Sequence, residues 1–394
     1  MKKIILFSMF LCICFSINAL SVEEVYKTIF SDNADLKSIF SADFLQVLPP
    51  EKIIEVVKIY KNSLGNFKSV EKNDDMYKVI FEKGFADSRI SFNSDNLVNS
   101  LWFGGPQLTE DDFDKIIKDF SKIAEHTSIT IIKNNKDYIL KHNHDKKLGV
   151  GSAFKLYVLR ALDEKIKRRE TGWSRVIFLK DELKTLPSGI LQEWPDMTPV
   201  TLKTLANLMI QFSDNTATDI LIDYLKPEYI EKFSPKSIAP FMSTSQMFNL
   251  KLATNHKFRV DYSKSDLKQQ RRILNSLKKQ FSMDDESVRN WKNPIDVDLI
   301  EWFVSTDDLC RVIYELRNNN SININPGTLA KKDWEKIGFK GGSEPGVFNL
   351  TYILQKKNSR DFYAISATAN DNEKVVEQKE FINIVNRLAN LINR

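Results

Sequence analysis

Three short motifs place serine hydroxyls and lysine amines where acyl-transfer chemistry would need them. They are Ser152-Ala153-Phe154-Lys155, Ser213-Asp214-Asn215 and Lys340-Gly341-Gly342-Ser343. A serine hydroxyl is a weak nucleophile until a neighbouring base takes its proton. A lysine three residues after a serine lies one helical turn away on the same face, so its amine is placed to be that base. The motifs therefore indicate nucleophilic catalysis by a serine.

Each of the first two motif types also occurs elsewhere in the chain. Ser-x-x-Lys recurs at Ser69, Ser265 and Ser276, and Ser-Asp-Asn recurs at Ser31 and Ser94. A copy taken alone is more often a surface or turn residue than a catalytic one. What distinguishes one set from the rest is the order of the three motifs and the elements around them.

The elements expected around the chosen set bring the motifs together. Ser152 follows a predicted strand pair, 128–132 and 138–141, and opens a helix. Ser213 follows a long apolar helix, and a second helical run starts just after it. Lys340 lies on a predicted strand that runs into a hairpin, where the glycines leave room for a substrate backbone along the strand edge.

This ordered set resembles the signature of the serine β-lactamases and penicillin-binding proteins, S-x-x-K, S-D-N and K-T-G. The resemblance extends over residues 106–394, and Ser-Asp-Asn is similar to the class A branch and its D,D-peptidase relatives. It implies an α+β fold of the β-lactamase/transpeptidase-like type, with an antiparallel sheet flanked by helices and a helical subdomain. It also implies a small-molecule or peptide substrate and no metal or organic cofactor, because protein groups supply the chemistry.

The resemblance assigns the nucleophile and the proton carriers. Ser152 would attack the carbonyl and become acylated, and Lys155 would take its proton. Ser213, held in place by Lys340, would pass a proton to the leaving nitrogen or oxygen.

The resemblance also assigns the groups that bind the substrate. Asn215 would donate a hydrogen bond to the substrate amide. The backbone N–H groups of Ser152 and Ser343, beside Gly342, would form the oxyanion hole. Loss of one such donor lowers the rate by about 10²–10³.

Two positions depart from the family pattern: one lies within the third motif, and the other follows the predicted hairpin. Gly341 stands where the family has a hydroxyl residue that helps to bind the substrate carboxylate, and Ser343 is the candidate substitute. Asn349 stands near the place where class A enzymes commonly carry an anion-binding arginine. A β-lactam carboxylate would therefore be held less firmly here.

The base that would clear the acyl-enzyme is the third departure. Glu286 begins a Glu-x-x-x-Asn match of the class A form, ending at Asn290, and is the tentative deacylation base. It lies in a long charged stretch, 263–290, where a chance match is at least as common as a base. With a positioned base, water destroys the penicillin; without one, the acyl-enzyme persists.

Several functions remain open at this point. The leading hypothesis is hydrolysis of a β-lactam or a related amide or ester. A D,D-peptidase or an esterase with slow β-lactam turnover is the close alternative, and a serine-dependent glutaminase is more remote. A non-catalytic protein that binds cell-wall peptide is the alternative of a different class. The intact serine and lysine set favours catalysis, whereas Gly341 and Glu286 favour the non-catalytic alternative.

The start of the chain has the pattern of a signal peptide. Two lysines precede an apolar run from residue 4 to residue 15, and Ala19 offers a small residue for cleavage. Removing residues 1–19 takes away two lysines, so the formal net charge falls from +5 to +3. We expect a periplasmic or secreted protein with no membrane span after cleavage, and so mild a charge does not favour a nucleic-acid partner.

The cysteines and histidines exclude two other kinds of site. Cleavage would remove Cys12 and Cys14, which leaves Cys310 alone and unable to form an internal disulfide. Apolar neighbours predict that Cys310 is buried in the core. The four histidines lack the spacing of metal ligands, so a zinc site is not expected.

A separate small domain is expected to precede the hydrolase-like region. With 394 residues and 42% apolar residues, the chain can form two folded units. Residues 20–105 read as α+β, with a helix opened by Pro50 and strands at 76–82, 89–93 and 97–103. Their order resembles the cone fold of nuclear transport factors and steroid isomerases, and we interpret the segment as an accessory domain. The domain that starts at residue 106 opens with a helix predicted to be capped by Thr109.

Overall fold

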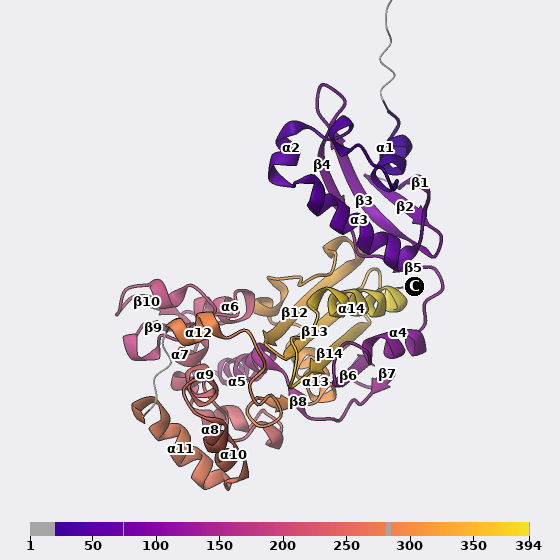
Figure 1. Ribbon diagram of the computed structural model, residues 1–394. Helices are drawn as coiled ribbons and strands as arrows, with labels where there is room; N and C mark the ends of the chain where they lie inside the picture. The colour runs from indigo at the N-terminus through magenta and orange to yellow at the C-terminus, as the bar shows by residue number, and fades with distance from the viewer. Residues whose placement is uncertain (1–19, 74, 281–284, 394) are drawn as a thin grey trace, which may run out of the picture. The chain divides into compact units, whose positions relative to one another are not determined.

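The computed structural model describes residues 20–73, 75–280 and 285–393 (Figure 1). The predicted signal peptide, 1–19, lies outside the described residues. The chain folds into two compact units, divided between Glu110 and Asp111. Among the described residues, no helix combines the length and the apolar character needed to cross a membrane.

The smaller unit has helices and one antiparallel sheet (Figure 1). The helices are α1 Val22–Ile29, α2 Ala42–Val47 and α3 Pro50–Leu64, and the strands are β1 Phe67–Asn73, β2 Met76–Phe81, β3 Gly84–Phe92, β4 Val98–Phe103 and β5 Gln107–Leu108. Proline opens α3 because it needs no backbone N–H there, and the positive φ of Gly65 ends it. The predicted helix and the strands predicted at 76–82 and 97–103 are confirmed, and the strand predicted at 89–93 is the second half of β3, which begins five residues earlier. The likeness of this unit to the cone fold stays a prediction.

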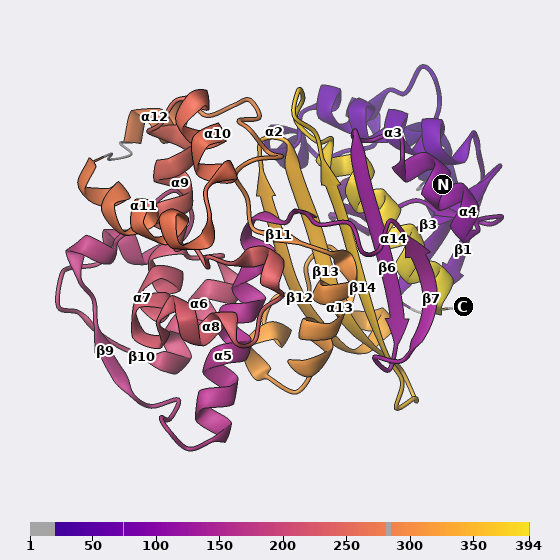
Figure 2. The same cartoon turned by 90° about the horizontal axis from the view of Figure 1, so that it is seen from below.

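The larger unit is built on a five-stranded antiparallel sheet in the order β12-β13-β14-β6-β7 (Figure 2). The strands are β6 His126–Lys133, β7 Asp137–His142, β12 Trp334–Glu344, β13 Val347–Lys356 and β14 Phe362–Asn370. Strands from the start and the end of the unit therefore lie side by side, as the sequence predicted. A two-residue turn at Pro345-Gly346 joins β12 to β13 and confirms the predicted hairpin.

Helices cover both faces of this sheet, so β13 and β14 are buried along most of their length. On one face pack α4 Phe113–Phe120 and the closing helix α14 Gln378–Asn393. On the other face, α5 Lys155–Lys167 and α13 Thr306–Glu315 share a large core with the helical middle of the chain. Cys310 is buried in this second core.

The helical middle forms a subdomain that lies beside β12 (Figure 2). Its helices are α6 Leu202–Gln211, α7 Asn215–Leu225, α8 Pro227–Glu231, α9 Thr244–Leu252, α10 His256–Lys264, α11 Leu267–Gln280 and α12 Asp285–Asn290. Two strand pairs complete the unit: β8 Leu148–Gly149 with β11 Phe303–Val304, and β9 Val176–Phe178 with β10 Pro199–Thr201. The unit has the predicted β-lactamase/transpeptidase-like fold.

The cap predicted for α4 was placed three residues too early. The helix is capped by Asp112, whose carboxylate accepts a hydrogen bond from the backbone N–H of Lys115 at 2.7 Å, and not by Thr109. A carboxylate at this position also interacts favourably with the positive end of the helix dipole. An aspartate nearer the first apolar residue is therefore the better cap.

Candidate active site

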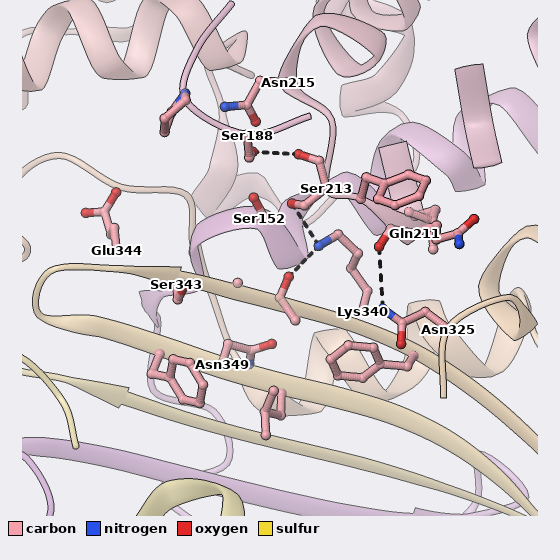
Figure 3. Close-up of a pocket in the computed structure, with 18 of the residues that line it drawn as sticks. Ser152, Ser188, Gln211, Ser213, Asn215, Asn325, Lys340, Ser343, Glu344 and Asn349 are labelled. Atoms are coloured by element: carbon pink, nitrogen blue, oxygen red, sulfur yellow. Dashed lines mark hydrogen bonds between the residues drawn. The ribbon is translucent and has the colours of Figure 1, made fainter. Parts of the chain in front are cut away.

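The three motifs meet at one cavity of about 560 Å³ in the larger unit. Figure 3 shows Ser152, Ser213 and Lys340 pointing toward one another, with Ser343 on the neighbouring strand edge. The residues of the predicted set that line the cavity are Ser152, Ser213, Asn215, Lys340, Gly342 and Ser343. Lys155 lies behind this lining, buried in the core and bonded to Ser213 and Asn215.

Ser152 belongs to a short 3₁₀ helix, η2 Gly151–Phe154, which runs directly into α5. The backbone N–H of Lys155 donates to the carbonyl of Ser152, so the two residues lie one turn apart. Ser152 is half-buried and lines the cavity. Apolar side chains of α5, among them Leu156 and Leu159, are fully buried and hold this turn in place.

The amine of Lys155 is buried and directed at the second motif. Its Nζ donates hydrogen bonds to the carbonyl of Ser213 at 2.5 Å and to Oδ1 of Asn215 at 2.7 Å. Burial, reinforced by the nearby charge of Lys340, lowers the pKa of Lys155 well below its ordinary value. A lowered pKa favours the neutral amine, which is the form that can accept a proton from a serine.

Ser213 is held in a strained backbone conformation between α6 and α7. Its φ of 55° lies in the left-handed region, which a serine rarely adopts. The next residue, Asp214, accepts hydrogen bonds from the backbone N–H groups of Ile190 at 2.7 Å and Leu191 at 3.0 Å. Ser188 donates to the carbonyl of Ser213 at 2.8 Å. These bonds fix the loop that aims the Ser213 hydroxyl into the cavity.

The hydroxyl of Ser213 connects the two amines of the site. Its Oγ lies 3.2 Å from Nζ of Lys155 and 3.1 Å from Nζ of Lys340. Lys340 is also buried, and its amine donates to the carbonyl of Gly341 at 2.5 Å. Burial lowers the pKa of Lys340 to about 7. An amine with a pKa near 7 can be either protonated or neutral near neutral pH.

Replacing Lys340 by methionine should change how the stability of the protein depends on pH. The pKa of this amine is about 7 in the folded protein against 10.5 in its ordinary state. Between these values the unfolded chain binds the extra proton, so Lys340 makes the wild type gain stability as pH rises. In Lys340→Met we expect the free energy of unfolding to rise less steeply between pH 7 and pH 9.

Denaturant unfolding of the full chain at several pH values measures this slope. The half-buried Lys336, on the same strand, offers the matched control Lys336→Met. Equal slopes for wild type and Lys340→Met would contradict the lowered pKa of Lys340.

The backbone of β12 touches η2 at the two glycines. A Cβ on Gly342 would lie 2.1 Å from the carbonyl oxygen of Val150 and 2.5 Å from the backbone nitrogen of Ser152. A Cβ on Gly151, which has a φ of 48°, would lie 3.1 Å from the backbone nitrogen of Ser343. Only glycine allows so close an approach. The contact brings the two backbone nitrogens predicted for the oxyanion hole to facing edges of the cavity.

Asn215 uses its side chain to hold the site together. Its Oδ1 accepts from Lys155 at 2.7 Å, and its Nδ2 donates to the carbonyl of Leu186 at 2.9 Å. It also lines the cavity, so the predicted contact with a substrate amide stays a prediction. The structure adds a role that the sequence did not reveal, which is to orient the amine of Lys155.

The two departures in the sheet have local physical reasons. A Cβ on Gly341 would lie 3.0 Å from Cζ of Phe339, so this aromatic ring occupies the space that a hydroxyl residue would need. Asn349 is fully buried, and its amide donates to the carbonyl of Ala367 at 3.0 Å and to Oγ1 of Thr368 at 2.8 Å. Neither position offers a charged donor to a substrate carboxylate.

The structure does not bring Glu286 to the site. It is exposed on α12, whereas the cavity is lined from this region by Val288 and Trp291. Val288 belongs to α12 and Trp291 follows its last residue, whereas Glu286 is not among the residues that line the cavity. The local sequence match could not distinguish the faces of this short helix.

Replacing Glu286 by glutamine should therefore leave catalysis unchanged. We expect the rates of acylation and deacylation with benzylpenicillin to stay within about two-fold of wild type, since the side chain is exposed and lies off the cavity lining. Stopped-flow absorbance measures the antibiotic, and intact mass measures the adduct. Selective loss of deacylation would restore Glu286 as the base.

Sequence reasoning missed Glu344, which lines the cavity beside Ser343 (Figure 3). Its carboxylate forms an ion pair with the buried amine of Lys251, which also lies 3.1 Å from Oε1 of Glu301. An acidic residue directly after Lys340-Gly341-Gly342-Ser343 was the available signal. Its partners lie far away in the sequence, so the pairing itself could not be predicted.

Solved structures similar to this chain include two bacterial β-lactamases. The enzyme from Sphaerobacter thermophilus is 18% identical, with 72% of this chain and 98% of that chain covered and a TM-score of 0.49. The enzyme from Francisella tularensis is 17% identical, with 71% of this chain and 97% of that chain covered and a TM-score of 0.48. A mutant of PBP-A, solved as an acyl-enzyme complex with penicillin G, is 14% identical, with 72% and 97% covered and a TM-score of 0.47.

A family model gives the link at the level of sequence. Residues 109–280 match the model of the Beta-lactamase enzyme family, a segment that includes Ser152, Lys155 and Ser213 and ends before Lys340. No curated protein matches the chain. The match supports the β-lactamase enzyme family for the segment that carries the first two motifs.

Proposed function

We propose that this protein is a serine hydrolase that forms an acyl-enzyme on Ser152 and acts on a β-lactam or a related amide or ester. One observation carries the proposal: the Ser213 hydroxyl lies within 3.2 Å of two buried amines, at a cavity that Ser152 also lines. Buried amines with lowered pKa values beside serine hydroxyls are an arrangement for moving protons rather than for stability. The family match of residues 109–280 agrees with it.

Acylation follows from this geometry. The neutral amine of Lys155 takes the proton of Ser152 as Oγ attacks the carbonyl carbon, and the carbonyl oxygen becomes negative. The backbone N–H groups of Ser152 and Ser343 stabilise that oxygen. The bond to the leaving nitrogen or oxygen then breaks. Ser213 gives that atom its own proton and is reprotonated from Lys155 or Lys340.

Release of the acyl group is proposed to be the slow step. Glu344 is the one acidic side chain that lines the cavity within the part of the chain that the structure describes, and its carboxylate is paired with Lys251. A carboxylate engaged in this way is a poor base for activating water. This observation favours the second candidate function, a D,D-peptidase or esterase on which a β-lactam turns over slowly.

The decisive experiment is the intact mass of the protein after brief exposure to benzylpenicillin, with Ser152→Ala as control. A stable mass increase on wild type alone supports the acyl-enzyme and slow release. Rapid loss of the antibiotic without an adduct would favour an efficient β-lactamase. No adduct and no loss would refute β-lactams as substrates. If esters and cell-wall peptides then also bind without turnover, the protein is the non-catalytic alternative.

We also propose that the chain is exported to the periplasm or secreted after removal of residues 1–19. The support is the sequence pattern of two lysines, an apolar run and Ala19. Expression of the full chain and N-terminal sequencing of the exported product test it. A mature chain that begins at Leu20 supports the proposal, and retention of Met1 on a protein left inside the cell would refute it.

A further inference from the structure

Three ionisable side chains that the proposed reaction does not use are buried together beside the cavity. Lys251 is on α9, Glu301 precedes β11, and Glu344 ends β12. Their side chains are 0%, 0% and 3% exposed. The amine of Lys251 lies 3.1 Å from Oε1 of Glu301 and also pairs with Oε1 of Glu344. Burying three ionisable groups is costly, so an arrangement of this kind needs an explanation beyond stability.

The two carboxyl groups are linked to η2 and β12, the two segments that carry the backbone nitrogens predicted for the oxyanion hole. Oε2 of Glu301 accepts a hydrogen bond from the backbone N–H of Gly151 at 3.3 Å, and Gly151 immediately precedes Ser152. Glu344 immediately follows Ser343 on β12. The amine of Lys251 therefore links the residue before one oxyanion-hole nitrogen to the residue after the other.

We infer, on the basis of the proposed function, that Lys251 is a positioning residue for the oxyanion hole. By holding Glu301 and Glu344 together, it sets the separation between the backbone N–H groups of Ser152 and Ser343. An oxyanion hole needs its two donors about 2.7–3.1 Å from one oxygen atom, so a small change in this separation lowers the rate.

Local packing keeps the three side chains of this cluster in fixed positions. A Cβ on Gly149 would lie 2.5 Å from Cγ of Glu301, so that side chain is packed tightly against β8 and has little freedom to move. Arg259 donates to the backbone carbonyl of Lys251 at 3.1 Å and fixes the end of α9. Without the amine, the two buried carboxyl groups lose the donor that joins them, and one of them would take up a proton, so the link between η2 and β12 would change.

Glu344 has a competing role to consider, because it also lines the cavity. As a general base it would need a carboxylate open to water. Its side chain is only 3% exposed and is engaged by Lys251. Burial and the neighbouring Glu301 raise its pKa well above the ordinary value, although Lys251 acts in the opposite direction. These contacts favour a structural link over a base.

The test uses the full-length protein, benzylpenicillin and the variant Lys251→Met, which keeps the length of the side chain and removes its charge. We expect the acylation rate constant to fall by about 10–100-fold, less than the loss of a whole donor. The adduct should still form on Ser152 at full stoichiometry. In infrared difference spectra the ester carbonyl of the adduct should shift to higher wavenumber, because its hydrogen bonds weaken.

The matched control is Lys257→Met, an exposed lysine of α10 that pairs with Asp261 on the surface, and it should leave both readouts unchanged. An unchanged rate and carbonyl band in folded Lys251→Met would overturn the inference. If wild type neither forms an adduct nor consumes the antibiotic, β-lactams are not substrates, and both that part of the proposed function and the inference tested on it fail. If wild type is acylated and Lys251→Met behaves like wild type, the proposed function stands and only the positioning role of Lys251 is refuted.

A second variant decides the matter if Lys251→Met does not fold. Glu344→Gln keeps the volume of the side chain and leaves one carboxylate beside one amine. We expect a smaller shift of the carbonyl band in the same direction. Loss of deacylation with an unchanged band and an unchanged acylation rate would make Glu344 a general base and overturn the positioning role.

Discussion

Replacing Lys155 by methionine is expected to slow the acylation of Ser152 by benzylpenicillin by about 10²–10⁴-fold, the usual contribution of a general base. The Lys155 amine is fully buried, its pKa is lowered, and it lies one turn from Ser152, which is why we propose it as the proton acceptor. Methionine fills the same space without a lone pair of that basicity. The variant should fold, with a modest loss of stability because Oδ1 of Asn215 loses its donor.

Time-resolved intact mass measures the acylation rate, and thermal unfolding measures the fold. Lys167→Met is the matched control, since it makes the same change on α5 at a lysine whose side chain is 58% exposed and pairs with Asp163. We expect it to acylate like wild type. A Lys155→Met protein that acylates at the wild-type rate would show that the base lies elsewhere, with Lys340 the next residue to replace.

The core of the site could be predicted because its signals are local. Ser152 and Lys155 are one helical turn apart, so their proximity follows from the spacing alone. The strands could be predicted because β13 and β14 are rich in apolar, aromatic and β-branched residues, and both are buried along most of their length. Both inferences need only neighbours in the sequence.

The rest depended on contacts that no local pattern contains. Lys251 and Glu344 are 93 residues apart, and nothing near either residue indicates the other. The positive φ of Ser213 is imposed by the hydrogen bonds of its neighbours and not by its own residue type. Glu286 matched the motif by residue type, but tertiary packing decides which residues of α12 reach the cavity.

The second large effect is expected from Gly342→Ala. A methyl group at this position would lie 2.1 Å from the carbonyl oxygen of Val150, 2.5 Å from the backbone nitrogen of Ser152 and 2.8 Å from that of Ala153. All three are backbone atoms, so no side-chain rotation relieves the contact and η2 must move away from β12. We expect a loss of about 1–3 kcal/mol in the free energy of unfolding, as for other overpacked sites. We expect acylation to fall by about 10²–10³-fold, because the two oxyanion donors separate.

Comparing how each variant changes the stability, the acylation rate and the carbonyl band tests the site better than the size of any one loss. Gly172→Ala is the control, because a Cβ there meets nothing within 4 Å, and it should change neither stability nor acylation. Gly342→Ala leaves the side chains of Lys155, Lys340 and Ser213 in place, so we expect it to disturb the oxyanion hole more than the contacts between the amines and Ser213. The residual adduct should therefore show a carbonyl band at higher wavenumber, whereas the adduct of Lys155→Met should keep the wild-type band. If Gly342→Ala acylates at the wild-type rate, the backbone nitrogens of Ser152 and Ser343 do not stabilise the transition state, and the donors must be sought elsewhere on the cavity wall.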